Sequence, residues 1–295
     1  MEKKTLNTEE LRYLKMQNWI FGSSGINPYD GEEVYNESGI KERLKDEEVL
    51  IIPKDTSVIS GFIKWLYTGV EQEGFTRDMI MKKNRNISEY FDPGALQITT
   101  SAFVHSKERV ALLRVKECYA YAENTLTMIQ GHVDTSVPGM DDFIVGSVMQ
   151  MSDPIEALNN FRTVLRENMK KEMEEELKYV EDENFNASYI DMYMDINNKN
   201  IDVVYAPYSD SLRCHIGVVF DVSVADDRLE CLQVNEPDKH YGVELIYLDE
   251  LHKHIHELDP WIIEYIATCK NDKFRKMYSE KVFDREIFEM VDDGE

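Results

Sequence analysis

The residues best suited to chemistry in this sequence lie in one acidic segment, Lys171–Glu176. The segment reads Lys-Glu-Met-Glu-Glu-Glu and falls in the lower half of a helical pattern that begins near Asp153. Clustered carboxylates supply the oxygen ligands that hard divalent cations prefer. Acidic runs are also common on solvated helix faces, so each glutamate has to be judged by its neighbours along the helix.

The helical pattern places two of these glutamates on its apolar face. That face is formed by residues spaced three and four apart, namely Leu158, Phe161, Leu165 and Met169. Continuing the stripe at about 100° per residue leads through Glu172 and Glu176. Asp153 and Pro154 suit the first positions of a helix. The sequence therefore predicts two carboxylates where the helix calls for buried side chains.

Charged neighbours separate the glutamates further. Glu174 and Glu175 each have lysines three or four residues away, so both can form ordinary surface ion pairs. Glu172 and Glu176 have no such lysine, and they repel each other at a spacing of four. Burying an unpaired carboxylate is costly, and a bound divalent cation would offset that cost. The alternative is a helix that breaks near Asn168, so that its second half rotates and exposes both acids.

The rest of the sequence alternates between strand and helix patterns. Strands are indicated at 49–53, 96–104, 110–115, 126–129, 189–196, 201–205, 213–224, 231–234 and 243–248, and further helices at 58–67, 249–258 and 261–268. A turn is expected at Gln130-Gly131-His132, and a loop at 134–151. Strands on both sides of one central helix predict an α/β fold, with a mixed sheet and helices packed on its faces. We expect a domain at 46–268, an N-terminal arm at 1–45 and a charged helical tail at 269–295.

Composition excludes several classes of function. The chain has 295 residues and a formal net charge of -24, with no basic stripe, so nucleic-acid binding is disfavoured. A small phosphorylated ligand could still bind through a bridging divalent metal. The four cysteines lack zinc-site spacing, and there is neither a secretory signal nor an apolar run of membrane-spanning length. We expect a cytosolic protein that does not bind membranes, and the sequence is compatible with a homodimer.

Segment 171–179 resembles the core of the Nudix box, in which an arginine and a glutamate precede an aliphatic residue, any residue and two glutamates. The matching residues are Glu172, Met173, Glu175 and Glu176. Lys171 stands in place of the arginine, and Lys178 in place of a later glycine. The stretch 130–133 resembles the glycine–histidine turn of one Nudix-like phosphoesterase group, and 213–220 resembles the strand after its box helix. The lead-in strands of that group are similar to 49–53 and 96–100, so the resemblance covers about 46–268.

This resemblance implies a Nudix-like α/β/α sandwich with a central carboxylate-bearing helix. It also implies a role for each site residue. Glu172, Glu175, Glu176 and the backbone at Gly131 would ligate Mg²⁺ or Mn²⁺, and Lys171, Glu175 and Glu176 would be catalytic. A general base would come from this helix or from a later loop, where Glu236 and Glu244 are the candidates. From their positions in the sequence, His132 would orient the turn and Asp134 could support a metal ligand without touching the metal. The implied reaction is hydrolysis of a diphosphate bond in a small nucleoside diphosphate-linked compound.

Two other functions are compatible with the sequence. The departures at Lys171 and Lys178 favour a Nudix-like module that binds a nucleotide or a protein without turnover. The polar arm and the charged tail are compatible with a structural interaction protein. Metal-dependent turnover would distinguish the first hypothesis from both alternatives.

Overall fold

The structure is a computed structural model that describes residues 48–84, 94–116, 124–148, 153–179, 201–204, 215–254, 257–269 and 271. Its first elements are β1 (Glu48–Pro53), α4 (Thr56–Thr68), the 3₁₀ helix η1 (Arg77–Met79), β2 (Met81–Asn84), β3 (Ala95–His105), β4 (Arg109–Val115), β5 (Leu126–Thr127), β6 (Ile129–His132) and α6 (Met140–Val148). The later elements are α7 (Pro154–Glu176), β7 (Leu177–Tyr179), β8 (Ile201–Val204), β9 (His215–Ser223), α10 (Asp226–Leu229), β10 (Leu232–Val234), β11 (His240–Tyr247), the 3₁₀ helix η2 (Leu248–His254) and α11 (Pro260–Thr268).

Strand β3 is the centre of the main sheet. Within the described residues this sheet has nine strands, and its longest path runs β11-β4-β3-β1-β2. Strand β3 pairs antiparallel with β1, β4 and β6, and parallel with β9 from Gln97↔His215 to His105↔Ser223. A second, two-stranded sheet is formed by β7 and β10. The predicted mixed sheet is therefore confirmed.

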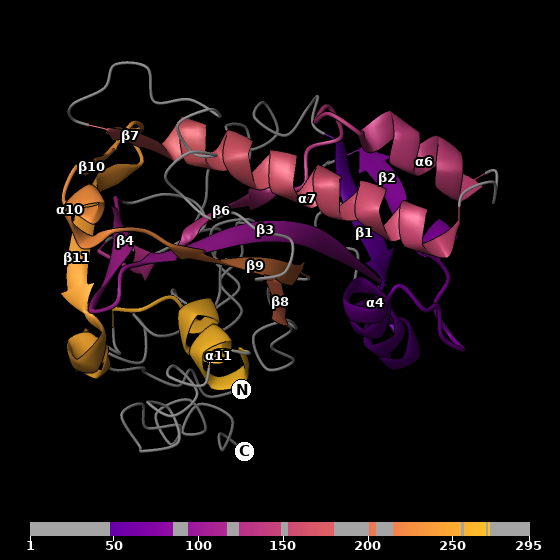
Figure 1. Cartoon of the computed structure of the whole chain (residues 1–295), viewed down its shortest axis with the longest axis horizontal. Coiled ribbons are helices and arrows are strands. Elements are labelled where there is room, and N and C mark those ends of the chain that lie inside the picture. Colours follow the sequence, from indigo (N-terminus) through magenta and orange to yellow (C-terminus); the bar gives the residue numbers. More distant parts are fainter. Residues whose placement is uncertain are drawn as a thin grey trace, which may run out of the picture.

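Helices α7 and α11 cover opposite faces of this sheet (Figure 1). Alternate residues of a strand point to opposite faces, which divides the core in two. Val104 belongs to the core beneath α7, together with Phe161 of that helix. Phe103 and Val219 belong to the core beneath α11, where the Phe103 ring lies 5.0 Å from that of Tyr265. The expected α/β/α sandwich with a carboxylate-bearing helix is the architecture observed.

Two local expectations are wrong. Gln130-Gly131-His132 is no turn but most of strand β6, which pairs with residues Thr99 to Ala102 of β3. Its backbone groups find partners in the sheet, so the glycine does not end the strand. The expected loop at 134–151 contains helix α6. Phe143 of that helix is buried 4.8 Å from the ring of Phe161, so apolar burial outweighs the glycines here.

Several predicted segments lie outside the described residues: the arm at 1–45, the strand at 189–196 and nearly all of the tail at 269–295.

The helix expected at 249–258 is the 3₁₀ helix η2. Among the described residues, no helix is both long enough and apolar enough to cross a membrane.

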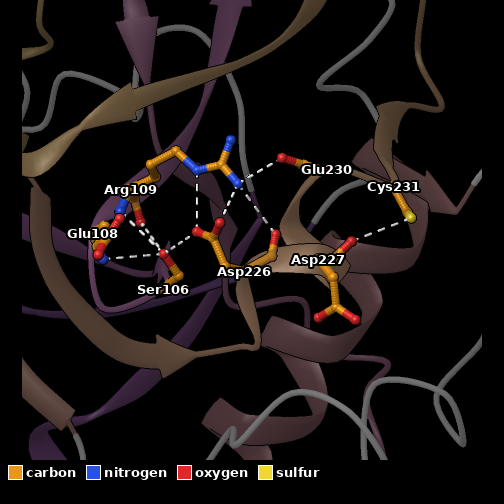
Figure 2. Close-up of polar contacts among 7 residues, drawn as sticks. All are labelled: Ser106, Glu108, Arg109, Asp226, Asp227, Glu230 and Cys231. Carbon is orange, nitrogen blue, oxygen red and sulfur yellow. Dashed lines mark hydrogen bonds and ion pairs between the residues drawn. The ribbon is translucent and has the colours of Figure 1, made fainter.

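A polar network ties the β3–β4 turn to the short helix α10 (Figure 2). Arg109 donates from Nε to Oδ1 of Asp226 at 3.0 Å and from Nη2 to Oε1 of Glu230 at 2.8 Å. The hydroxyl of Ser106 donates to the same Asp226 oxygen at 2.6 Å. Because α10 leads into β10, the network anchors the start of the strand that reaches the carboxylate end of α7.

Candidate metal centre at the end of helix α7

Helix α7 is continuous through Asn168. The side chain of Asp153 caps its first turn by accepting a hydrogen bond from the Ile155 N–H at 2.7 Å. Asn168 is fully buried, where it donates to Thr100 Oγ1 and accepts from the Asp134 N–H, both at 2.8 Å. A buried polar side chain with both partners satisfied does not disrupt a helix. The alternative of a break near Asn168 is therefore wrong, and the stripe of apolar residues continues into the glutamates.

Glu172 lies directly against the backbone of strand β6. A Cβ atom built on Gly131 would come within 2.0 Å of Cδ of Glu172, so any larger residue would displace the carboxylate. This close approach explains the glycine in a strand that otherwise carries side chains. Strand β6 and helix α7 together hold the carboxylate of Glu172 at the boundary between sheet and helix.

Glu176 is the last residue of α7, and its side chain is only 13% exposed. Its Oε2 accepts a hydrogen bond from the Gln130 N–H at 3.3 Å. Its Oε1 lies 3.8 Å from Nε2 of His240, which is too long for a hydrogen bond. Strand β6 thus contacts both glutamates, Glu172 through Gly131 and Glu176 through Gln130.

The β7–β10 pair brings a second segment to this end of the helix. Strand β7 follows α7 directly, and β10 returns antiparallel to it with Val234 opposite Leu177. Asn235 then satisfies the terminal carbonyls of the helix: its N–H donates to the Glu176 carbonyl at 2.8 Å, and its Nδ2 lies 3.2 Å from the Glu175 carbonyl. These hydrogen bonds fix the loop that carries Glu236 and leads to His240.

Glu176, Glu236 and His240 form a compact cluster. One ligand atom from each lies within 4.8 Å of the other two. Oε1 of Glu236 pairs with Lys239 Nζ at 2.7 Å, and its Oε2 is buried. The His240 side chain is 7% exposed. Among the described residues, neither ring nitrogen of His240 nor Oε2 of Glu236 has a hydrogen-bond partner.

These observations fit a divalent cation. Buried polar atoms normally have partners, so the imidazole of His240 and Oε2 of Glu236 offer ligating capacity that the described residues do not use. Glu172 and Glu176 add carboxylate oxygens, which Mg²⁺ and Mn²⁺ prefer. The donor set is therefore one that a metal ion would complete.

Lys171 contacts two other residues of the expected site, Asp134 and Glu175. Its Nζ lies 2.6 Å from Oδ2 of Asp134 and 3.7 Å from Oε1 of Glu175. Burial lowers the pKa of Lys171, but the contacts with Asp134, Glu175 and Glu172 together outweigh burial and leave the pKa raised. The side chain of Glu175 is 51% exposed. Lys171 thus connects the helix to the segment after β6 but makes no forked contact.

The two candidates for general base are placed differently. Glu236 belongs to the cluster, whereas Glu244 pairs with Arg114 through both carboxylate oxygens, one of them at 2.7 Å. His132, on β6, packs edge to face on His215, with the ring centroids 5.2 Å apart. Of the residues expected from the sequence, Glu172 lies against Gly131, and Glu176 lies beside Glu236.

Burial makes ionisation of the two central glutamates unfavourable. Burial raises the pKa of Glu172 to about 8, and the nearby carboxylates of Glu176 and Glu175 raise it further. Burial also raises the pKa of Glu176, an effect that the interaction with His240 opposes. A bound cation would favour the ionised form of both groups.

The raised pKa of Glu172 predicts that metal-free protein loses stability as pH rises. Below about pH 4.5 Glu172 is protonated in both the folded and the unfolded state. Between about pH 4.5 and about pH 8 it keeps the proton only in the folded state. The unfolded state then binds fewer protons, so the free energy of unfolding falls, by on the order of 4 kcal/mol across the window. Urea unfolding with chelator at about pH 5 and about pH 9 measures this. Glu172→Gln should lose much less stability, and an equal loss would contradict the assignment.

His240 is the site residue that sequence reasoning missed. It follows Glu236 at a spacing of four, and the His240 N–H donates to the Glu236 carbonyl at 3.1 Å. The sequence shows this Glu-Pro-Asp-Lys-His spacing, but not that the turn places both side chains at the end of α7. The contact depends on pairing between β7 and β10, whose residues are far apart in the chain.

No protein-family profile and no curated protein matches the sequence. Among solved structures, the chain is similar to Tm1382, a candidate Nudix hydrolase, at 17% identity over 80% of this chain and 100% of that one, with a TM-score of 0.42. It is also similar to a bifunctional NMN adenylyltransferase/ADP ribose pyrophosphatase from Francisella tularensis, at 12% identity over 64% of this chain, with a TM-score of 0.35. The match covers 42% of that enzyme, so the chain spans less than half of its length. A third similar structure is a C. elegans Ap4A hydrolase, at 14% identity over 54% of this chain and 85% of that one, with a TM-score of 0.31.

Proposed function

We propose that this protein is a metal-dependent hydrolase that cleaves a diphosphate bond in a nucleoside diphosphate-linked compound. The observation that carries the proposal is the pair Glu172 and Glu176. Both are held at the end of one helix against strand β6, and both have raised pKa values that a cation would reverse. A fold gains nothing from two adjacent buried carboxylates, so their presence supports a bound ion.

The chain's own residues have separate tasks in this reaction. Glu172, Glu175 and Glu176 would hold Mg²⁺ or Mn²⁺, with Glu175 in a half-exposed position. When bound, the cation supplies charge neutralisation at the phosphate oxygens and a water of lowered pKa. Lys171 keeps Glu175 and Asp134 in place.

Glu236 is the candidate base that lies at this site. Its Oε1 is paired with Lys239, so only Oε2 remains for chemistry. That oxygen can do one of two things: accept a proton from water or ligate a metal ion. Glu244 is held by Arg114, which would have to release it before it could accept a proton.

The nature of the substrate follows from charge and from the resemblance. A chain with a net charge of -24 repels phosphate groups, so a phosphorylated substrate would need the cation to bind. The resemblance to the Nudix box supports a diphosphate attached to a nucleoside. The proposal therefore predicts that binding, and not only turnover, requires the metal.

A panel of nucleoside diphosphate-linked compounds and dinucleoside polyphosphates tests this function. We expect phosphate-containing products from at least one member with Mn²⁺ or Mg²⁺, and none with chelator present. Glu175→Gln should remove this activity, whereas Glu174→Gln, a neighbour outside the cluster, should retain it. Products are scored as inorganic phosphate after phosphatase coupling. Activity that survives Glu175→Gln would contradict the assigned role of this glutamate.

The alternative is a module that binds a nucleotide without turnover. It is favoured by Lys171, which stands in place of the box arginine and is already engaged by Asp134. Calorimetry that shows metal-dependent binding from a panel that gives no turnover would support this alternative and overturn the hydrolase.

A further inference from the structure

The cluster at the end of α7 contains a donor that is neither a carboxylate nor solvent-exposed. His240 begins strand β11, and its side chain is 7% exposed. Both of its ring nitrogens are buried, and among the described residues neither has a hydrogen-bond partner. A buried imidazole of this kind has lost its hydrogen bonds to water without gaining hydrogen bonds to the described residues. This loss destabilises the folded protein unless a ligand binds the imidazole.

An ion pair with Glu176 does not account for His240. The distance from Nε2 to Oε1 of Glu176 is 3.8 Å, beyond hydrogen-bond range. Two atoms that each ligate one cation at about 2.0–2.2 Å lie at most about 4.4 Å apart, so 3.8 Å fits ligands of a shared ion. Glu236 completes the group, in which one ligand atom from each residue lies within 4.8 Å of the others. Its Oε2 is also buried and has no hydrogen-bond partner among the described residues.

We propose that Glu176, Glu236 and His240 form a mixed imidazole–carboxylate metal position that selects transition-metal ions such as Zn²⁺, Co²⁺ and Mn²⁺ over Mg²⁺. Imidazole is a good ligand for transition metals, whereas Mg²⁺ prefers oxygen ligands and retains its water. The inference rests on the proposed function in one respect: Glu176 belongs both to this position and to the α7 glutamates that would hold the catalytic cation.

This position also decides the role of Glu236. One of its oxygens pairs with Lys239, and the other is buried with no hydrogen-bond partner among the described residues. A carboxylate that ligates through the second oxygen has none left to accept a proton. Glu236 is therefore a metal ligand, and its replacement should weaken metal binding more than it alters turnover at saturating metal.

The direct test is pulsed EPR of Mn²⁺ bound to the full chain after removal of metal with chelator. We expect nitrogen modulation from a histidine ligand, with the ¹⁵N pattern when the protein is labelled at histidine. This measurement uses the unaltered protein, so it does not depend on the folding of any variant. Absence of histidine nitrogen coupling at saturating Mn²⁺ would overturn the proposal.

Calorimetry of the variants provides the second readout. His240→Phe should lower Zn²⁺ affinity by at least about a hundredfold, while Mg²⁺ affinity changes by less than about threefold. His254→Phe, in η2, is the matched control and should leave both affinities unchanged. If circular dichroism shows His240→Phe unfolded, His240→Gln replaces it. Unchanged Zn²⁺ affinity in a folded variant would overturn the proposal.

The two proposals fail independently. Histidine coupling without hydrolysis of any member of the panel would leave this metal position standing and remove the hydrolase. Hydrolysis that depends on Mg²⁺ or Mn²⁺ without histidine coupling would do the reverse.

Discussion

Replacing Glu176 with glutamine is expected to abolish metal-dependent hydrolysis and at the same time to stabilise the metal-free protein. The carboxylate is buried at the end of α7, where burial raises its pKa. Glutamine has nearly the same shape, and its carbonyl can still accept the hydrogen bond from the Gln130 N–H. At alkaline pH the free energy of unfolding should rise by roughly 1–3 kcal/mol, because a buried charge is replaced by a neutral amide.

The loss of activity should reach at least about a thousandfold, which corresponds to the several kcal/mol that a metal ion contributes to a transition state. Steady-state kinetics on the substrate identified by the panel measures this, and urea unfolding with chelator measures stability. Glu174→Gln is the control on both counts. If Glu176→Gln lost both activity and stability, the carboxylate would be a structural residue and not a metal ligand.

Replacing Gly131 with alanine is expected to be the most damaging single-methyl change at the site. The added Cβ would lie 2.0 Å from Cδ and 2.1 Å from Oε2 of Glu172. Strand β6 is paired with β3 and cannot retreat, so the glutamate has to move. The carboxylate is the far end of a flexible side chain, so the shift itself costs little stability. Displacement of a ligand by about 1 Å can nevertheless lower turnover about a hundredfold.

Gly242→Ala is the matched control, since a Cβ at Gly242 would meet no atom within 4 Å. Thermal unfolding and turnover are measured for both variants at saturating Mn²⁺. A Gly131→Ala protein with native activity would show that the position of Glu172 is unimportant for the reaction.

The features that the sequence predicted are those governed by local periodicity. The spacing of Leu158, Phe161, Leu165 and Met169 placed Glu172 and Glu176 on the buried face. The helix is continuous, and both glutamates are partly buried in it. Gly131 lies against Glu172, but in a strand and not in the expected turn. In a strand the same glycine is needed for close approach of a carboxylate, which local sequence cannot distinguish from a turn.

The features that escaped prediction depend on distant pairing. His240 reaches the site only because Asn235 caps α7 and β10 pairs with β7. Glu244 carries the same charge as Glu236, yet it faces Arg114 across the β4–β11 pair. Neither outcome follows from residue type or from spacing along one element. They were determined by which strands meet.

The order of assembly has a consequence for folding kinetics. Strand β3 must find β9, with Gln97 opposite His215, and β11 must dock on β4 before His240 can approach Glu176. Contacts with such large sequence separation make folding slow, since long chain segments have to close before they are stabilised. A metal ion that needs all of these ligands finds them only in the nearly native chain. It would therefore slow unfolding and leave the folding rate unchanged, so that the metal extends the lifetime of the folded protein without helping it to form.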